Sequence, residues 1–289
     1  MPNEDLRDWI SGIEAAGELK LIKGAEPKEE IGAFVDIYQR KMGNPALMFD
    51  EIPGFPKGHR VIANILTSVP RINIALGLPP QASEMKLIQW WRNYMKHAPS
   101  QKPTPVNGGP LLDNVLEGKD VNIQSIPTPV WHERDGGPFI GTACMVAMKD
   151  PDSGWINYGC YRIQSQGPDV ATVFMSPGKH GLIIMGKYHE RKQPCPVAVI
   201  VGMHPAMFML AGLEIPYART KSRLLAESSA KPSKSSTCRA RGSPCRQIRR
   251  SRLKGSSIRT ISCRKVRSAS GRVTTRPAAI SSLQSALPR

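Results

Sequence analysis

The chain opens with apolar residues at helical spacing. The residues on the apolar face of this predicted first helix are Leu6, Trp9, Ile10 and Ile13. Asn3 is placed to cap the helix, acidic residues occupy its first turn, and Gly17 marks its end. The pattern predicts an amphipathic helix on the surface of a folded domain.

The pattern then alternates between helical and extended segments. We expect a second helix over residues 28–42, followed by two neighbouring strands in the apolar runs ALMFDEI and RVIANIL. A turn region rich in Pro and Gly, IPGFPKGH, separates the two runs. Residues 84–97 return to helical spacing at Leu87, Ile88, Trp91 and Met95. Residues 1–106 are therefore predicted to form an N-terminal α/β region.

From Ile126 onward the sequence pattern is typical of extended β-strands. The four predicted strand segments are FIGTACMVAMKD, WINYGCYRIQSQ, VATVFMS and VAVIVGM. The turn DPDSG joins the first two as a hairpin, and a helix that opens with SPGKHG fits between the last two, over about residues 178–191. The apolar stretch 196–213 is broken by His204 and Pro205, so it predicts a buried strand, a loop and a further segment, with no membrane span.

Four polar residues stand out within these apolar segments: Asn157, Arg162, Lys179 and His180. One interpretation leaves Asn157 and Arg162 on the solvent face of a strand that bends at Gly159. In the other, Arg162, Lys179 and the unpaired N–H groups at the helix start bind a phosphate-bearing cofactor. Asn157 and His180 would then supply oxygen and nitrogen to a metal ion.

Charge divides the chain at about residue 219. The net charge of +17 lies entirely in residues 220–289, where eighteen Lys and Arg face one acid, Glu227, and no aromatic residue occurs. The preceding residues are balanced in charge, so composition gives no reason to place nucleic acid or a membrane against them. With widely spaced cysteines and no signal-peptide pattern, we expect a reduced, cytoplasmic protein.

An ordered series of motifs resembles the UbiD-type decarboxylases. The similar segments are NPALMFDEIPGF, VIANILTSVPRINIALGLP, TPVWHERDGGPFIGTACMVAMKDPDSGWINYGCYRIQ and FMSPGKHGLIIMGKYHE. The resemblance implies non-oxidative decarboxylation of an aromatic or α,β-unsaturated carboxylic acid with prenylated FMN, a cofactor made by a flavin prenyltransferase. It also implies a divalent metal such as Mn²⁺, a K⁺ ion, a split β-barrel that binds the flavin, and a homo-oligomeric intact protein.

The resemblance assigns roles residue by residue. Asn157 and His180 match two metal ligands, and the backbone carbonyl of Trp155 matches a potassium contact. The positions that match the surroundings of the cofactor are Cys160, Tyr161, Arg162 and Lys179. Arg162 is also the expected catalytic residue, because its planar fork suits a substrate carboxylate.

Other residues that could carry chemistry are interpreted as structural. His132, His189 and His204 are assigned packing or surface roles, as are the methionines near residue 205. Arg71 is given the same interpretation unless a cofactor contact requires it.

The family pattern stops after EIPY. The resemblance requires a Glu as third metal ligand there and a later PEGPFGE motif with two catalytic glutamates, whereas this chain continues ARTKSRLLAESS. With suitable third bases, CRKVRSASGRVTT read one frame over gives VPEGPFGEWTGYY, and residues 219–221 give Asn-Glu. We interpret the tail as out-of-frame rather than as a nucleic-acid-binding arm. The expected organisation is an α/β region (1–106), an incomplete split β-barrel domain (107–218) and a disordered basic tail (219–289), with little or no decarboxylase activity.

Overall fold

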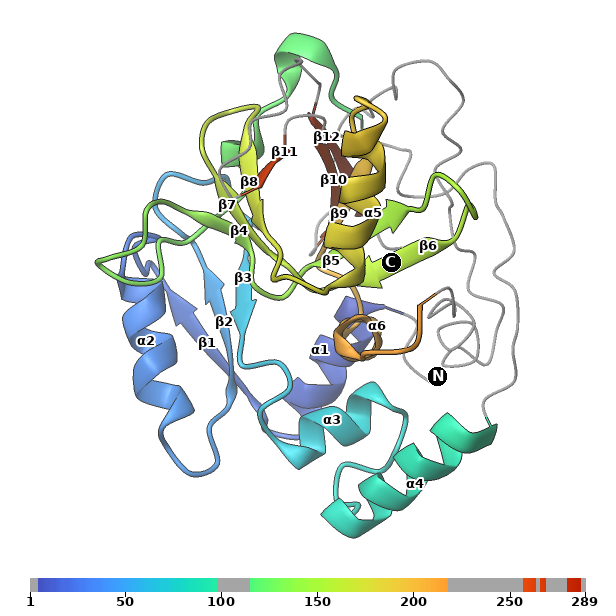
Figure 1. The fold of residues 1–289 in the computed structure, drawn as a ribbon. Coiled ribbons are helices and arrows are strands. Elements are labelled where there is room, and N and C mark those ends of the chain that lie inside the picture. The colour runs from blue at the N-terminus through green and yellow to red at the C-terminus, as the bar shows by residue number, and fades with distance from the viewer. Residues whose placement is uncertain (1–4, 98–114, 218–256, 264–265, 269–279, 287–289) are drawn as a thin grey trace.

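The structure is a computed structural model that describes residues 5–97, 115–217, 257–263, 266–268 and 280–286. It has a mixed α/β architecture with two contiguous parts (Figure 1). The first part is an α/β layer at the N-terminus, and the second contains two larger β-sheets with helices beside them.

The first part is a small sheet covered on both faces. Its elements are α1 (Leu6–Ala15), β1 (Leu19–Lys23), α2 (Glu30–Gln39), β2 (Ala46–Asp50), β3 (Val61–Ala63), α3 (Val69–Ala75) and α4 (Glu84–His97). β2 lies in the centre, parallel to β1 and antiparallel to β3. All five β2 residues are buried, because Ala46 packs against α1 and α3 while Leu47 and Phe49 pack against α2.

The first helix confirms the sequence pattern, with a different cap. Trp9 and Ile13 are fully buried on its inner face. The N-cap is Asp5, whose Oδ1 accepts hydrogen bonds from the backbone N–H of Arg7 at 2.7 Å and of Asp8 at 3.0 Å. The prediction of Asn3 as the cap is therefore wrong for this helix, since a side chain caps only the residues two or three positions ahead.

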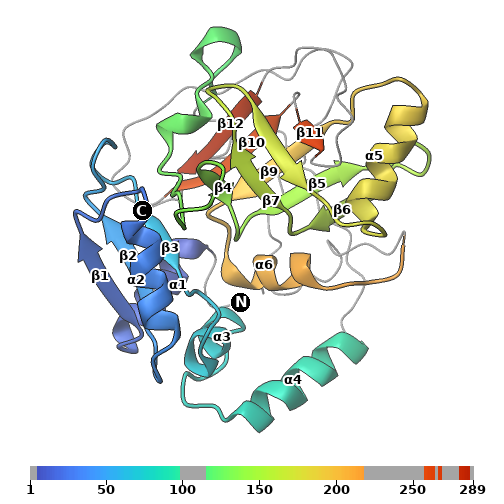
Figure 2. The same ribbon diagram turned by 60° about the vertical axis from the view of Figure 1, so that its left-hand side comes forward.

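α4 begins and ends at the residues that the sequence predicts, yet it buries none of its side chains. It lies at the edge of the molecule next to α3 in both views (Figures 1 and 2). Trp90 and Tyr94 stack on one another with ring centroids 5.0 Å apart, while Met85 and Ile88 are at least half exposed. The helical spacing therefore predicts the helix and not its burial.

The second part is built from two β-sheets whose strands within residues 139–201 pair antiparallel. Its strands and α-helices are β4 (Phe139–Gly141), β5 (Met145–Lys149), β6 (Ile156–Gly159), β7 (Arg162–Ser165), β8 (Ala171–Phe174), α5 (His180–Glu190), β9 (Val197–Val201) and α6 (Pro205–Gly212). Two short 3₁₀ turns, Gly118–Asp120 and Ile123–Ser125, precede them. Three further strands complete the sheets: β10 (Ser257–Cys263), β11 (Val266–Ser268) and β12 (Ile280–Ala286). One sheet has the order β12-β10-β9-β5-β6 and the other β11-β8-β7-β4.

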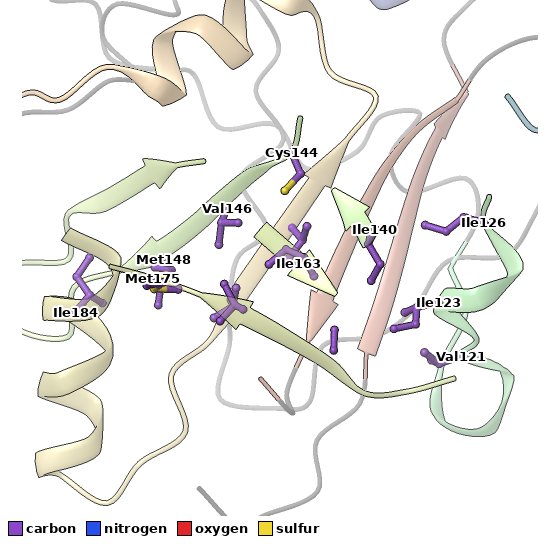
Figure 3. Close-up of a cluster of buried hydrophobic side chains, with 14 of the residues drawn as sticks. Val121, Ile123, Ile126, Ile140, Cys144, Val146, Met148, Ile163, Met175 and Ile184 are labelled. Atoms are coloured by element: carbon purple, nitrogen blue, oxygen red, sulfur yellow. The ribbon is translucent and has the colours of Figure 1, made fainter. Parts of the chain in front are cut away.

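One core fills the space between these two sheets (Figure 3). Val146 and Met148 of β5 enter it from one sheet, Ile163 of β7 enters from the other, and Ile184 enters from α5. α6 covers the opposite side of β5 and β6 and also contacts α3, so it connects the second part to the first.

The tail differs from the sequence prediction in three stretches. Instead of a wholly disordered segment, the structure has β10 (Ser257–Cys263), β11 (Val266–Ser268) and β12 (Ile280–Ala286). β10 pairs antiparallel with β9, and β11 pairs parallel with β8. The physical reason is that edge strands present unpaired N–H and C=O groups, which another segment satisfies through its backbone alone. The other tail residues and the expected linker at residues 101–107 lie outside the described residues.

No helix within the described residues has both the length and the apolar character required to cross a bilayer.

Candidate functional site

The candidate site forms where the chain passes from one large sheet to the other. The predicted DPDSG turn does join β5 and β6 as a hairpin, with Val146 opposite Gly159 and Lys149 opposite Ile156. The predicted bend after Gly159 is also confirmed. β6 belongs to the five-stranded sheet and β7 to the four-stranded one, so Cys160 and Tyr161 make the crossing between them.

The two faces of β6 have different surroundings. Asn157 is only 2% exposed, and its side chain shares a face with Gly159, as the alternating burial of this strand requires. Tyr158 and Cys160 pack instead with Met203 and Phe208 on the side of α6. Asn157 therefore lies inside the molecule and not on the solvent face that one interpretation of the sequence gave it.

The start of α5 supplies the next two predicted residues. Lys179 is the N-cap residue and His180 the first residue of the helix. The Lys179 ammonium forms an ion pair with the carboxylate of Glu214. The His180 ring packs edge-on against two aromatic rings that also contact each other, with its centroid 5.5 Å from that of Trp155 and 5.3 Å from that of Tyr217.

Tyr161 connects these two groups of residues. Its hydroxyl oxygen accepts a hydrogen bond from Asn157 Nδ2 at 3.4 Å and another from the backbone N–H of Gly181 at 3.0 Å. Gly181 directly follows His180. One phenol oxygen therefore contacts the Asn157 amide and the peptide that begins α5.

The remaining predicted residues are less closely associated. Arg162 is the first residue of β7 and is exposed. The Cys160 thiol donates to the Phe208 carbonyl at 3.8 Å, on the side of α6. The Trp155 carbonyl, expected to contact potassium, accepts the backbone N–H of Asp150 at 2.7 Å. The structure thus brings together Asn157, Tyr161 and His180, places Lys179 beside them in sequence, and leaves Cys160 on the opposite face of β6.

The residues that the sequence analysis interpreted as structural contact other protein groups. Arg71 is fully buried, and its Nη1 donates to Glu18 at 2.6 Å. His204 is buried at the start of α6, where Nδ1 accepts the N–H of Ala206 at 3.2 Å. His132 contacts Asp36 at the surface with Nε2 3.2 Å from Oδ2.

The sequence interpretation missed an ionic cluster behind the His180 ring. The fully buried Asp150 carboxylate accepts from Lys187 Nζ at 2.7 Å and from the Tyr217 hydroxyl. Although burial acts in the opposite direction, the hydrogen bond from Lys187 and that from Tyr217 hold the pKa of Asp150 well below its usual range. The hydrogen bond to Asp150 raises the pKa of Lys187. The cluster fixes Tyr217 against His180.

The side chains at the candidate site are of the chemical types that bind a metal ion and a phosphate. An amide oxygen from Asn157 and an imidazole nitrogen from His180 are suitable donors for manganese, and the Lys179 ammonium at the positive end of the α5 dipole suits an anion. Within the described parts of the chain, no group of three or more His, Cys, Asp or Glu residues is arranged to hold a metal ion. Asn157 and His180 would supply two ligands of such a site, and the expected third ligand position at residues 219–221 lies outside the described residues.

The fold is that of a mixed α/β protein whose buried Asn157 and partly buried Tyr161 lie where the chain crosses between two β-sheets. Residues 104–244 match the family described as the 3-octaprenyl-4-hydroxybenzoate carboxy-lyase Rift-related domain, UbiD. Residues 10–91 match the N-terminal domain of the same enzymes. The chain belongs to the UbiD family.

Curated relatives are decarboxylases of modest similarity. The chain is 26% identical over 221 residues to pyrrole-2-carboxylic acid decarboxylase of Pseudomonas aeruginosa, covering 73% of this chain and 44% of that protein. It is 28% identical over 227 residues to phenolic acid decarboxylase of Escherichia coli O157:H7, covering 75% of this chain and 46% of that protein. The matching region thus spans about half the length of these relatives.

Solved structures support the fold. Vanillic acid decarboxylase of Sedimentibacter hydroxybenzoicus in closed form superposes with a TM-score of 0.74 at 20% identity, covering 98% of this chain and 61% of that one. The UbiD-class enzyme HmfF from Pelotomaculum thermopropionicum in complex with FMN gives a TM-score of 0.72 at 18% identity, covering 97% of this chain and 61% of that one. The mixed α/β fold predicted from the sequence is confirmed.

Proposed function

We propose that this chain carries the N-terminal and flavin-binding parts of a prenylated-FMN-dependent carboxy-lyase. The reaction is the non-oxidative decarboxylation of an aromatic or α,β-unsaturated carboxylic acid. The observation that supports it most is the association of Asn157 and His180 through Tyr161, beside the cationic start of α5. The two facing sheets would form the predicted split β-barrel.

Each residue of the site has a role in this proposal. Asn157 and His180 hold the divalent metal, and Lys179 at the positive end of the α5 dipole binds the cofactor phosphate. Arg162, exposed at the start of β7, orients the substrate carboxylate through its planar fork. Prenylated FMN, when bound, supplies the electron sink that the reaction needs.

The chain as given has limited catalytic capacity in this proposal. The resemblance calls for three glutamates that the sequence after Tyr217 does not contain. A residue that donates a proton to the reacting carbon is then missing, and so is one metal ligand. We expect binding of the flavin with little carbon dioxide release, which makes a non-catalytic flavin-binding protein the second candidate.

The test compares the chain as given with a version in which the reading frame after Tyr217 is restored. Both are supplied with prenylated FMN, Mn²⁺ and K⁺, and flavin retention and carbon dioxide release are measured over a panel of aromatic and unsaturated acids. We expect retention by both and release only by the restored chain. In the restored chain, Asn157→Ala should lower the rate at least about tenfold, whereas Lys149→Ala, at an exposed β5 position, should not.

Two outcomes would contradict the proposal. Failure of both chains to retain flavin would remove the assigned function. Rapid carbon dioxide release by the chain as given would show that the glutamates are not needed.

A further inference from the structure

Tyr161 occupies a position that is defined by two glycines. A Cβ atom added at Gly159 would lie 2.7 Å from the Tyr161 ring and hydroxyl. A Cβ atom added at Gly181 would lie 2.7 Å from the same hydroxyl and 2.9 Å from the adjoining ring carbon. Neither glycine has a positive φ, so the requirement for Gly here comes from the closeness of the phenol ring and not from backbone strain.

The backbone of Tyr161 is held in place as well as its ring. The Cys144 thiol donates to the Tyr161 carbonyl at 3.2 Å, and Cys144 is fully buried in the core between the sheets. The backbone and the ring of Tyr161 therefore both have fixed places at the crossing from β6 to β7.

The hydroxyl orients two groups at once. Because Asn157 Nδ2 donates to it, the amide oxygen Oδ1 must point away from Tyr161. Because the Gly181 N–H donates to it, the peptide that follows His180 is held at a fixed distance from β6. A polar partner of this kind sets the direction of a metal-binding side chain without touching the metal.

We propose that Tyr161 is a positioning residue, whose hydroxyl, packed between Gly159 and Gly181, aligns the Asn157 amide oxygen and the His180 imidazole toward one divalent cation. This inference rests on the proposed function, because it assumes that Asn157 and His180 bind the metal. It gives Tyr161 a role different from the direct cofactor contact that the resemblance implies.

The experiment measures Mn²⁺ affinity of the full chain from the electron paramagnetic resonance signal of free Mn²⁺. Tyr161→Phe keeps the ring and removes the hydroxyl, and should weaken Mn²⁺ binding about tenfold. The matched control is Tyr158→Phe, whose ring lies on the α6 side of β6, and which should stay within about twofold of the unmodified chain on the same reasoning.

A second pair of variants tests the glycine spacing. Gly181→Ala places a methyl group against the phenol and should weaken Mn²⁺ binding at least as much as Tyr161→Phe. Gly186→Ala is the same substitution in the same helix with no heavy atom within 4 Å of the added methyl, and it should leave binding unchanged. This pair also decides the matter if Tyr161→Phe does not fold.

The outcomes separate the inference from the function on which it rests. Mn²⁺ affinity that is unchanged in Tyr161→Phe and Gly181→Ala would overturn the positioning role. If the unmodified chain binds no Mn²⁺, the proposed metal site fails, and hydrogen exchange of the Gly181 amide then tests the positioning by itself. Exchange at least about tenfold faster in Tyr161→Phe would support it, since that amide loses its acceptor, and unchanged exchange would overturn it.

Discussion

At the scale of single residues, the buried polar groups of Asn157 and Asp150 are each held by a hydrogen-bond partner. Asn157 could be singled out from the sequence as a polar residue in an apolar strand, although its burial and its partner Tyr161 could not. Asp150 could not, since the motif DPDSG is typical of a hairpin turn and gives no sign of Lys187, which comes from a helix 37 residues later. Its Oδ1 also accepts the backbone N–H of Asp152, so the same carboxylate closes the turn and anchors the helix.

Arg71 illustrates a role that depends entirely on tertiary structure. Its guanidinium is fully buried and contacts Glu18, Asn44 and Thr67, which come from separate segments of the N-terminal part. The sequence left a cofactor contact open for this residue. In the structure its described partners are all protein groups of the N-terminal part.

His204 leads to a prediction about pH. Burial lowers its pKa from 6.5 to about 4, so the unfolded chain takes up a proton on acidification before the folded protein does. The stability that the neutral ring supports is present above pH 6.5 and is lost as pH falls toward 4. We expect the free energy of unfolding to drop by about 2 kcal/mol between pH 7 and pH 5 from this group.

Urea denaturation at the two pH values measures this drop. His204→Asn keeps a side-chain acceptor for the Ala206 N–H but does not titrate, so its unfolding free energy should change much less over the same interval. An equal drop in the variant would show that other groups cause the pH dependence.

At the scale of elements, the spacing of hydrophobic residues predicts which helices form better than it predicts what each helix packs against. α1, α2, α4 and α5 were all expected, with bounds within a few residues. β1 and α3 were missed: β1 alternates weakly and has no buried residue, and α3 is only seven residues long and contains Pro70 in its first turn. Pairing with β2 forms the first, and packing against α1 stabilises the second.

A pair of substitutions contrasts two helices that look equally amphipathic in sequence. Ile13 in α1 is fully buried, whereas Ile88 in α4 is 50% exposed. Ile13→Ala should lower the free energy of unfolding by about 3 kcal/mol, because it removes buried methyl groups and leaves a cavity. Ile88→Ala should lower it by less than about 0.5 kcal/mol. Chemical denaturation compares the two, and equal losses would mean that α4 is packed in solution.

At the scale of the whole molecule, the reading frame is the main open prediction. If residues from about 219 are out-of-frame, the gene sequence with one frame restored should encode Asn-Glu at residues 219–221 and PEGPFGE after residue 262. Nucleotide sequencing of the gene decides this directly. A restored frame without that motif would contradict the interpretation, and the basic tail would then require another explanation. The UbiD match to residue 244 extends past Tyr217, so the boundary itself needs this test.

The pairing of β10 with β9 bears on how a fold would tolerate a change of reading frame. Five residue pairs join the two strands, and a β-ladder is made from peptide groups that every amino acid except proline supplies in full. The pairing of a strand with a sheet edge therefore depends on the shape of its backbone far more than on the identity of its side chains. If the tail is out-of-frame, its pairing with β9 means that many consecutive residues can change while the edge of this sheet stays covered, so that the fold would outlast the chemistry.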